Sequence, residues 1–274
     1  MLCMIVKDEA AIIGRALASV RSHIAAFCIV DTGSTDATVE RMREGLAGLP
    51  GTIVSRPWRD FSSNRNEGLA LAREFGSHAL ILDADEELTL PRGSFPPPAA
   101  DIDLVWAAER STKPAPALSK PRILRLDSGY RFKGVIHEAI AYDAAARHAD
   151  SADIVILAHY DGARSTSGSL KDKYLRDAQL LEDALVGEPD NSRSWYYLGM
   201  SYLAAAEPAR AEPPLQHLLT LPSALPSELY DARMRLATIA RQRGAIDACE
   251  AHLREASKRA PRRSDPLIVL AELA

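Results

Sequence analysis

Clusters of polar, mostly acidic residues follow three short apolar runs near the start of the chain. These clusters are Lys7-Asp8-Glu9, residues 31–36 and residues 83–87. Acidic side chains that gather in one place repel one another unless they bind cations, hydroxyl groups or base N–H groups. The residue types therefore predict a ligand site that several segments of the chain build together.

The third cluster contains two aspartates separated by a single residue, Asp83 and Asp85, directly after the apolar run 79–82. One carboxylate can accept a ribose hydroxyl while the other binds Mg²⁺ or Mn²⁺, which favour oxygen ligands. Such an ion neutralises a diphosphate leaving group. The alternative interpretation is an acidic helix N-terminus, where aspartate interacts favourably with the helix dipole.

The elements that must position these clusters alternate between strand and helix. The expected strands are residues 2–6, 27–30, 52–54 and 79–82, and the expected helices are residues 9–22, 36–42 and 62–75. This alternation predicts an α/β fold with a mostly parallel sheet and helices on both faces. The carboxyl ends of parallel strands lie at one edge, so the three clusters should meet there.

The alternation stops after residue 90. Seven prolines between residues 91 and 121 predict irregular structure bordering the site, although residues 103–108 could form a strand. Residues 122–126 and 154–157 are expected to be late strands of the same domain. Residues 163–169 are small and polar and predict a hinge.

From residue 170 onward the pattern is helical and repetitive. The first repeat contains Trp195, Leu198, Gly199, Tyr202, Ala211 and Leu215, and the second contains Leu236, Ala240, Gly244, Leu253, Ala256 and Pro261. Leu181, Ala184 and Pro189 suggest a leading half-repeat. This spacing fits tetratricopeptide repeats, with a plain helical bundle as the alternative. We expect two domains, residues 1–168 and 169–274.

Four motifs occur in order along the first domain: Met4-Ile-Val-Lys-Asp-Glu9, residues 29–38, Ser63-Asn-Arg-Asn66 and residues 82–87. Together they resemble the family-2 glycosyltransferases with the GT-A fold. The nearest subgroup is bacterial, carries tetratricopeptide repeats and includes the peptide S-glycosyltransferases of glycocin biosynthesis. Residues 130–138 resemble its closing Gly-x-x-His-Glu element. The catalytic resemblance covers roughly residues 2–160, and the repeats extend it to the end.

The resemblance implies roles for individual residues around the nucleotide-sugar. The residues that it places there are Asp8, Glu9, Asp31, Arg65, Asp83 and Ala84. Glu9 and Asp31 would contact the nucleoside, and Arg65 would contact the base or the diphosphate. Asp83 would then hold the ribose.

The resemblance also implies a metal site and leaves the catalytic base open. Asp85 would bind Mn²⁺ or Mg²⁺, and His137 would be a further ligand of the metal or the diphosphate. The chain has no Gln-x-x-Arg-Trp motif, and its single Glu-Asp pair, at residues 182–183, lies in a tail helix. Glu138 is the candidate base, and support of His137 or a backbone contact is its alternative role. His78, His148 and His159 are expected to be structural or exposed.

The implied activity is inverting, metal-dependent transfer from a nucleotide-sugar, with a UDP-sugar as the expected donor. The acceptor could be a peptide or protein, a glycan or a small molecule. One alternative is a nucleotidyltransferase acting on sugar phosphates, although residues 4–10 lack the glycine-rich basic loop of that class. Another is a non-catalytic tetratricopeptide adaptor on an inactive transferase domain. Asp31-Thr-Gly resembles an aspartic-protease motif, but the strand-helix alternation argues against that all-β class.

Composition excludes several other classes. The 33 basic and 37 acidic residues give a net charge of −4, which argues against a nucleic-acid surface. Three scattered cysteines do not suggest a disulfide framework or a zinc site. No apolar run approaches the roughly 20 residues that span a bilayer, and no leader is evident. We therefore expect a cytoplasmic protein whose repeats either face the acceptor or mediate homo-oligomer formation.

Overall fold

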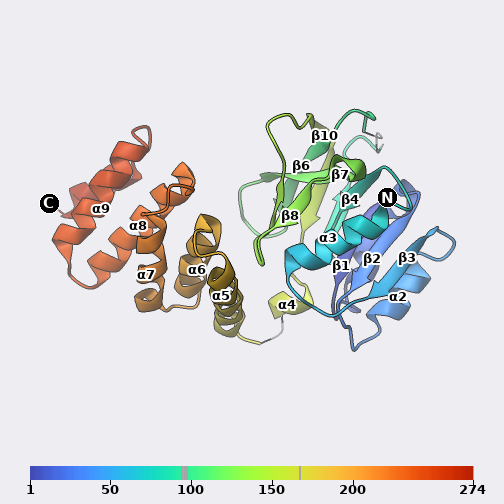
Figure 1. Cartoon of the computed structure of the whole chain (residues 1–274), viewed down its shortest axis with the longest axis horizontal. Helices are drawn as coiled ribbons and strands as arrows, with labels where there is room; N and C mark the ends of the chain where they lie inside the picture. The colour runs from blue at the N-terminus through green and yellow to red at the C-terminus, as the bar shows by residue number, and fades with distance from the viewer. Residues whose placement is uncertain (94, 96–97, 167, 274) are drawn as a thin grey trace. The chain divides into compact units, whose positions relative to one another are not determined.

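The computed structural model describes residues 1–93, 95, 98–166 and 168–273, within which the chain forms two compact units, Met1–Ser167 and Gly168–Ala274. In the described part of the first unit, one sheet has eight strands in the order β3-β2-β1-β4-β7-β6-β10-β5 (Figure 1). Their bounds are β1 Leu2–Val6, β2 Phe27–Asp31, β3 Gly51–Ser55, β4 His78–Ile81, β5 Glu86–Thr89, β6 Leu104–Ser111, β7 Leu118–Arg125 and β10 His148–Ala158. A separate pair, β8 Arg131–Lys133 and β9 Ala139–Ala141, is antiparallel.

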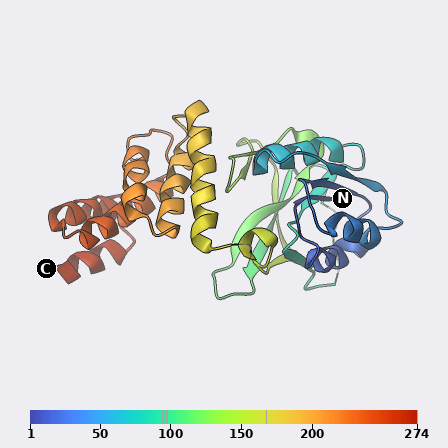
Figure 2. The same cartoon turned by 90° about the horizontal axis from the view of Figure 1, so that it is seen from below.

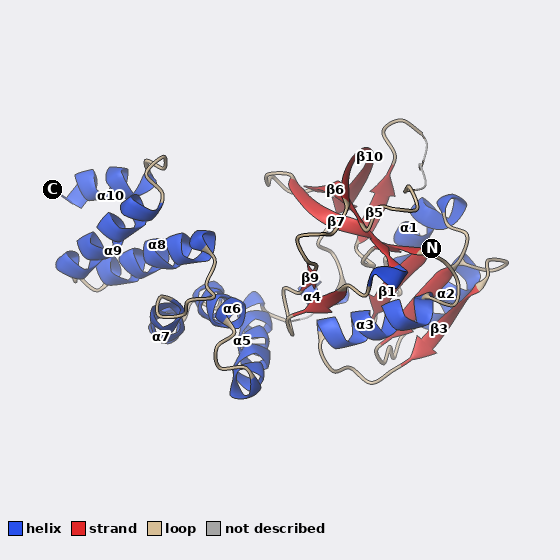
Figure 3. Cartoon of the chain, turned by 45° about the horizontal axis from the view of Figure 1, so that its top comes forward, coloured by secondary structure: helices blue, strands red, loops and turns tan. Residues whose placement is uncertain are grey.

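The sheet is mostly parallel, which confirms the predicted α/β fold. β3, β2, β1 and β4 run parallel, and β10 runs parallel to β6, whereas β7 is antiparallel to both of its neighbours (Figure 3). Val6 pairs with Asp31 at the matching ends of β1 and β2. The polar residues that follow these strands therefore begin at the same edge of the sheet.

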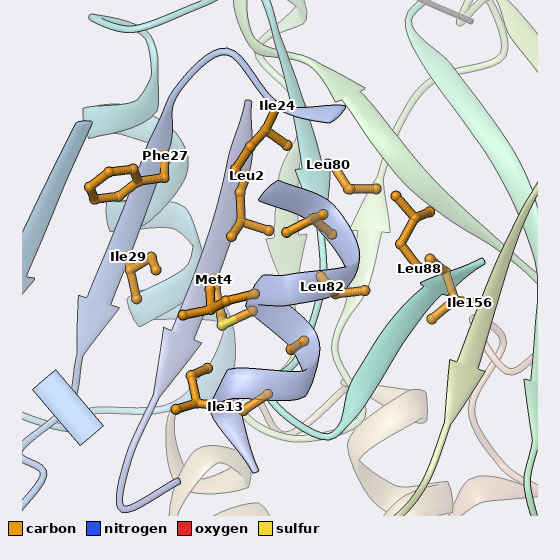
Figure 4. Packing of buried hydrophobic residues seen from close by; sticks show 14 of the residues in the cluster. Leu2, Met4, Ile13, Ile24, Phe27, Ile29, Leu80, Leu82, Leu88 and Ile156 are labelled. Atoms are coloured by element: carbon orange, nitrogen blue, oxygen red, sulfur yellow. The ribbon is translucent and has the colours of Figure 1, made fainter. Parts of the chain in front are cut away.

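Helices cover both faces of the parallel strands because strand side chains alternate in direction. Leu2 and Met4 pack in one apolar cluster with α1 (Ile13–Val20) and α2 (Thr38–Gly45), as Figure 4 shows for Ile13. Cys3 points to the opposite face, which α3 (Phe61–Ala72) covers. A Cβ on Gly68 would lie 3.3 Å from the Cys3 sulfur, so α3 lies close to the sheet. This packing fixes the strand ends that carry the site.

The stretch between residues 91 and 121 is more regular than predicted. β6 covers the strand that the sequence allowed at 103–108 and continues to Ser111, and β7 begins at Leu118, before the expected strand 122–126, so that Pro121 lies within it. Pro121 pairs with Trp106 where the register of the two strands shifts, and proline is tolerated at such irregularities. Pro96 and Pro97 lie outside the described residues.

The expected hinge at residues 163–169 also differs from the structure. Its first four residues form a single helical turn, α4 (Ala163–Thr166). Ser167 lies outside the described residues. The turn forms because Thr166 donates its backbone N–H and its hydroxyl to the Gly162 carbonyl.

The described part of the second unit is helical. Its helices are α5 Leu170–Gly187, α6 Ser192–Ala204, α7 Pro208–Leu218, α8 Pro226–Gln242, α9 Ile246–Arg259 and α10 Asp265–Leu273. Each packs against the next, as the yellow-to-red helices of Figure 2 show. Pairs α6/α7 and α8/α9 follow the predicted repeats, and α5 is the leading half-repeat. This arrangement resembles tetratricopeptide proteins.

We expect Gly199→Ala to destabilise the second unit by about 1–3 kcal/mol, the usual cost of overpacking. A methyl group on Gly199 would lie 2.5 Å from two carbons of Leu215, which is fully buried in α7. Gly187→Ala is the matched control, because nothing lies within 4 Å of its added methyl group. Denaturant unfolding checks both variants. Equal stability of the two variants would contradict this packing.

Candidate functional site

The loops after β1 and β2 are held together by Asp8. Its backbone N–H donates to the Ser34 hydroxyl at 2.9 Å, and its carboxylate accepts the Thr35 N–H at 2.7 Å. Asp8 has a left-handed backbone with φ of 55°, which turns the chain sharply at the end of β1. Asp8 therefore shapes the rim of the site through its contacts with the neighbouring loop.

Asp31 is only 4% exposed at the end of β2. Its carboxylate accepts the N–H groups of Gly33 and Ser34 at 3.2–3.3 Å, and Gly33 adopts a φ of 100° that favours glycine. The loop thus folds back onto the aspartate that begins it. Asp31 lies beside the Asp8 loop at the predicted sheet edge.

Glu9 and Asp85 meet at the segment that follows β10. Glu9 accepts the Ala163 N–H at 3.1–3.2 Å, and Asp85 accepts the Gly162 N–H. A Cβ on Gly162 would lie 3.1 Å from a Glu9 oxygen and 3.5 Å from an Asp85 oxygen. Two carboxylates from the segments after β1 and β4 therefore approach the same glycine, and a side chain there would crowd the Glu9 carboxylate.

The carboxylates of Glu9 and Asp85 lie in an unfavourable environment for negative charge. Burial raises the pKa of Glu9 to about 7, and the charges of Asp85 and Asp161 add to this effect. Burial, followed by the charge of Asp83, also raises the pKa of Asp85. A cation bound here would relieve this repulsion.

This environment predicts a pH-dependent effect of Glu9→Gln on stability. Because the pKa of folded Glu9 is about 7 and its ordinary value is 4.5, the folded protein holds this proton more tightly than the unfolded chain does. The stability that the protonated Glu9 carboxyl contributes is fully present below pH 4.5 and is lost as the pH rises through 7. The variant should therefore gain stability relative to wild type between these values. Denaturant midpoints in EDTA check this, and a constant difference would contradict it.

Asp83 is held by Arg65, whose guanidinium donates to both carboxylate oxygens at 2.8 and 3.0 Å. Burial raises the pKa of Asp83, but the charges of Arg65 and Arg122 outweigh this effect and hold that pKa below its usual value. Arg65 also donates through Nε to Glu138 at 2.6 Å, and its side chain is 10% exposed. The structure thus brings Arg65, Asp83 and Glu138 together.

The Ser63-Asn-Arg-Asn66 motif explains how Glu138 reaches this position. Asn66 donates to the Phe132 carbonyl at 2.9 Å and accepts the Phe132 N–H at 2.8 Å. The N–H of Phe61, at the start of α3, donates to the Val135 carbonyl. These bonds hold the strand before Glu138 against α3, on which Arg65 lies.

A metal could bind at Asp85 with support from substrate phosphates. Among the residues that the structure describes, no group of three or more His, Cys, Asp or Glu side chains is arranged to hold a metal ion. His137 is exposed, with a left-handed φ of 52°. Mg²⁺ often uses one or two carboxylates and completes its shell with waters and phosphates. The oxygen donors of Asp85 and Glu9 fit such a hard cation.

Residues that follow β10 also contribute to the site, although the sequence did not predict this. Arg15 donates to both oxygens of Asp161 at 2.7 and 2.9 Å, which ties this segment to α1. The His159 ring contacts Glu87 through Nε2 at 3.1 Å, and the His159 backbone N–H donates to the Asp85 carbonyl. These residues directly follow the apolar run 154–157, so the strand-end argument that found Asp83 applies to them as well.

In the described chain, no helix is both long and apolar enough to cross a membrane.

Comparison with known proteins adds three findings. The model for glycosyl transferase family 2 matches residues 1–91. A TPR repeat-containing protein of Synechococcus elongatus is 30% identical over 260 residues, with 90% of this chain and 63% of the relative covered. This chain therefore spans less than two thirds of that relative's length.

The third finding is a likeness to solved structures of TarS from S. aureus. Residues 1–349 of TarS match with 12% identity and a TM-score of 0.50, covering 94% of this chain and 90% of that chain. A complex of the same fragment with UDP-GlcNAc matches with 13% identity and a TM-score of 0.47, covering 94% and 91%. At this identity the first match shows the fold alone.

The family match covers the ends of β1, β2 and β4 with the loops that follow them, which supply Glu9, Asp31 and Asp85. The remaining strands of the sheet complete the fold shared with TarS. Residues 1–91 of this chain thus match glycosyl transferase family 2, and the helical region in the second unit resembles tetratricopeptide-repeat proteins.

Proposed function

We propose that this protein is a metal-dependent, inverting glycosyltransferase that uses a nucleotide-sugar donor. The observation that carries the proposal is the convergence of Glu9 and Asp85 on Gly162, within a family 2 domain. Their raised pKa values mark a place where burial and neighbouring carboxylates disfavour negative charge. A donor diphosphate with its divalent ion supplies both a cation for these carboxylates and a ligand for the neighbouring loops.

The nucleoside would bind at the loops shaped by Asp8, Glu9 and Asp31. Asp83 would hold the ribose, with Ala84 in the turn between the two aspartates. Because both carboxylate oxygens of Asp83 accept from Arg65, we propose that this guanidinium orients Asp83 toward the donor. This differs from the direct base or diphosphate contact that the sequence resemblance implies for Arg65.

Asp85 would hold Mn²⁺ or Mg²⁺, and His137 would be a further ligand. The bound ion would neutralise charge on the diphosphate as it leaves. We propose that Glu138 accepts the proton of the acceptor nucleophile. The new bond forms at the anomeric carbon while the bond to the diphosphate oxygen breaks, so both electrons of that bond leave with the nucleoside diphosphate. The Arg65 contact fixes one oxygen of Glu138 during this step.

The donor is proposed to be a UDP-sugar, and TarS has been solved with UDP-GlcNAc bound. The acceptor would be a peptide or protein, a glycan or a small molecule. The helical repeats would contact the acceptor or join copies of the chain.

Thermal unfolding with a panel of nucleotide-sugars tests the proposed donor class. A ligand that binds the folded state at 100 times its Kd adds about 2.7 kcal/mol of stability. We expect UDP and UDP-sugars to raise the unfolding temperature more with Mn²⁺ than with EDTA. Nucleoside monophosphates serve as the control, because they lack the diphosphate that shares the metal. Absence of stabilisation by every nucleotide-sugar would contradict the proposal.

A further inference from the structure

A buried cluster of charged residues lies behind the turn that carries Asp83 and Asp85. Arg122 donates to both oxygens of Glu86 at 2.6 and 2.8 Å and also contacts Glu109. All three residues of this cluster are no more than 6% exposed. Arg122 reaches inward from the place where the β6/β7 register shifts, between Pro121 and Ile123.

Glu86 connects this cluster directly to the proposed donor site. Its carboxylate accepts the backbone N–H of Asp83 at 2.9 Å, and its own N–H donates to the Asp83 carbonyl at 3.1 Å. The two bonds close the four-residue turn from both sides. The directions in which Asp83 and Asp85 leave the turn therefore depend on where Arg122 holds Glu86.

The other end of the cluster reaches the segment after β10. Glu109 accepts from the Tyr160 hydroxyl at 3.4 Å and forms an ion pair with Lys120 at 2.7 Å. Tyr160 immediately precedes Asp161, which pairs with Arg15, and Gly162, which lies beside the carboxylates of Glu9 and Asp85. The cluster thus contacts both segments that bring the acidic side chains together.

Stability alone does not explain such an arrangement. Removing two charges from water is costly, and apolar side chains of similar size often replace a buried ion pair without loss. The Nε of Arg122 is buried and has no hydrogen-bond partner among the described residues, which adds to the cost. The turn, by contrast, needs an acceptor for the Asp83 N–H, and Glu86 supplies it.

We propose that Glu86 and Arg122 are positioning residues of the donor site, acting through the Asp83 N–H to fix the turn that carries Asp83 and Asp85. The expected effect on turnover rests on the proposed function. The dependence of the turn on Glu86 as an acceptor does not rest on it.

Two double variants isolate this hydrogen bond. Glu86→Gln/Arg122→Met keeps an acceptor for the Asp83 N–H, whereas Glu86→Leu/Arg122→Met removes it. Both remove the buried ion pair, and Glu109 keeps Lys120 and Tyr160 as partners in each. Arg125→Met is the strand-matched control, because Arg125 lies in β7 and pairs with Asp103 and Asp127.

Metal-dependent hydrolysis of UDP-sugar is expected to fall about 10- to 100-fold in the leucine variant, a typical loss when a supporting partner of a metal site is removed. Arg125→Met should retain most of the wild-type rate. The rate of the glutamine variant should lie between those of Arg125→Met and the leucine variant, because it keeps an acceptor for the Asp83 N–H but lacks Arg122. Unfolding midpoints should be similar in the two double variants. Equal rates in the two double variants would overturn the proposal. A loss of rate that parallels the loss of stability across the two double variants and Arg125→Met would overturn it as well.

Amide hydrogen exchange separates failure of this inference from failure of the proposed function. The Asp83 amide should exchange faster in the leucine variant than in the glutamine variant, whether or not the enzyme turns over a donor. If the wild-type protein hydrolyses no nucleotide-sugar, the proposed function fails and the exchange rates still decide the positioning role. Equal protection of the Asp83 amide in both variants would overturn that role.

Discussion

Replacing Asp85 with asparagine is expected to lower the rate of sugar transfer on the order of 10³-fold while leaving the fold intact. The rate falls because the amide is a poorer ligand for a hard divalent cation, and loss of about 4 kcal/mol of charge stabilisation corresponds to three powers of ten. The fold survives because burial and the charge of Asp83 already raise the pKa of Asp85. Removing that charge relieves repulsion with Glu9 and Asp83.

Steady-state rates across a Mn²⁺ titration, together with unfolding midpoints, measure this effect. Asp101→Asn is the matched control, since Asp101 belongs to an exposed ion pair with Arg147. We expect that control to keep the wild-type rate and metal dependence. Full activity of the Asp85 variant would remove Asp85 from the metal site.

Glu138→Gln is expected to lower the chemical rate by about 10²- to 10⁴-fold, with donor affinity nearly unchanged. Glutamine retains an oxygen that can accept from Arg65, so the local contacts that hold residue 138 should survive. What it loses is the capacity to take the acceptor's proton. Single-turnover rates and UDP affinity together measure the two effects.

His137→Ala is the companion variant and should weaken binding of the donor with its metal. If Glu138→Gln keeps most of its rate, the base is another carboxylate, or the acceptor arrives already ionised, as a thiolate does. If it loses donor affinity as well, Glu138 acts through Arg65 and Asp83. The two variants together therefore separate proton transfer from donor binding.

The strand-end pattern in the sequence predicted that its acidic clusters gather at one edge of the sheet. They do so because β1, β2 and β4 are parallel neighbours, which places Glu9, Asp31 and Asp85 at that edge. The helical repeats were predictable for a similar reason. Large and small residues such as Leu215 and Gly199 must recur at fixed spacing for paired helices to pack.

The partners of individual site residues could not be predicted in this way. Arg65 and Glu138 are 73 positions apart, and nothing local indicates that they form an ion pair. The contacts of Asp161 and Gly162 depend on β10 returning beside β6, a non-local pairing. Arg122 begins the expected strand 122–126, directly after the proline-containing stretch, and nothing local indicates that its side chain is buried. Its burial depends on the strand register, which composition does not encode.

Release of UDP from a UDP-sugar, compared with Mn²⁺ and with EDTA, is the direct test of metal-dependent sugar transfer. We expect the wild-type protein to release nucleoside diphosphate slowly, and this release should depend on the metal and be lost in Asp85→Asn. An adaptor built on an inactive domain would release nothing with any donor. A nucleotidyltransferase would instead form nucleoside triphosphate and sugar phosphate when pyrophosphate is added. Either result, or release that EDTA leaves unchanged, would contradict a metal-dependent glycosyltransferase.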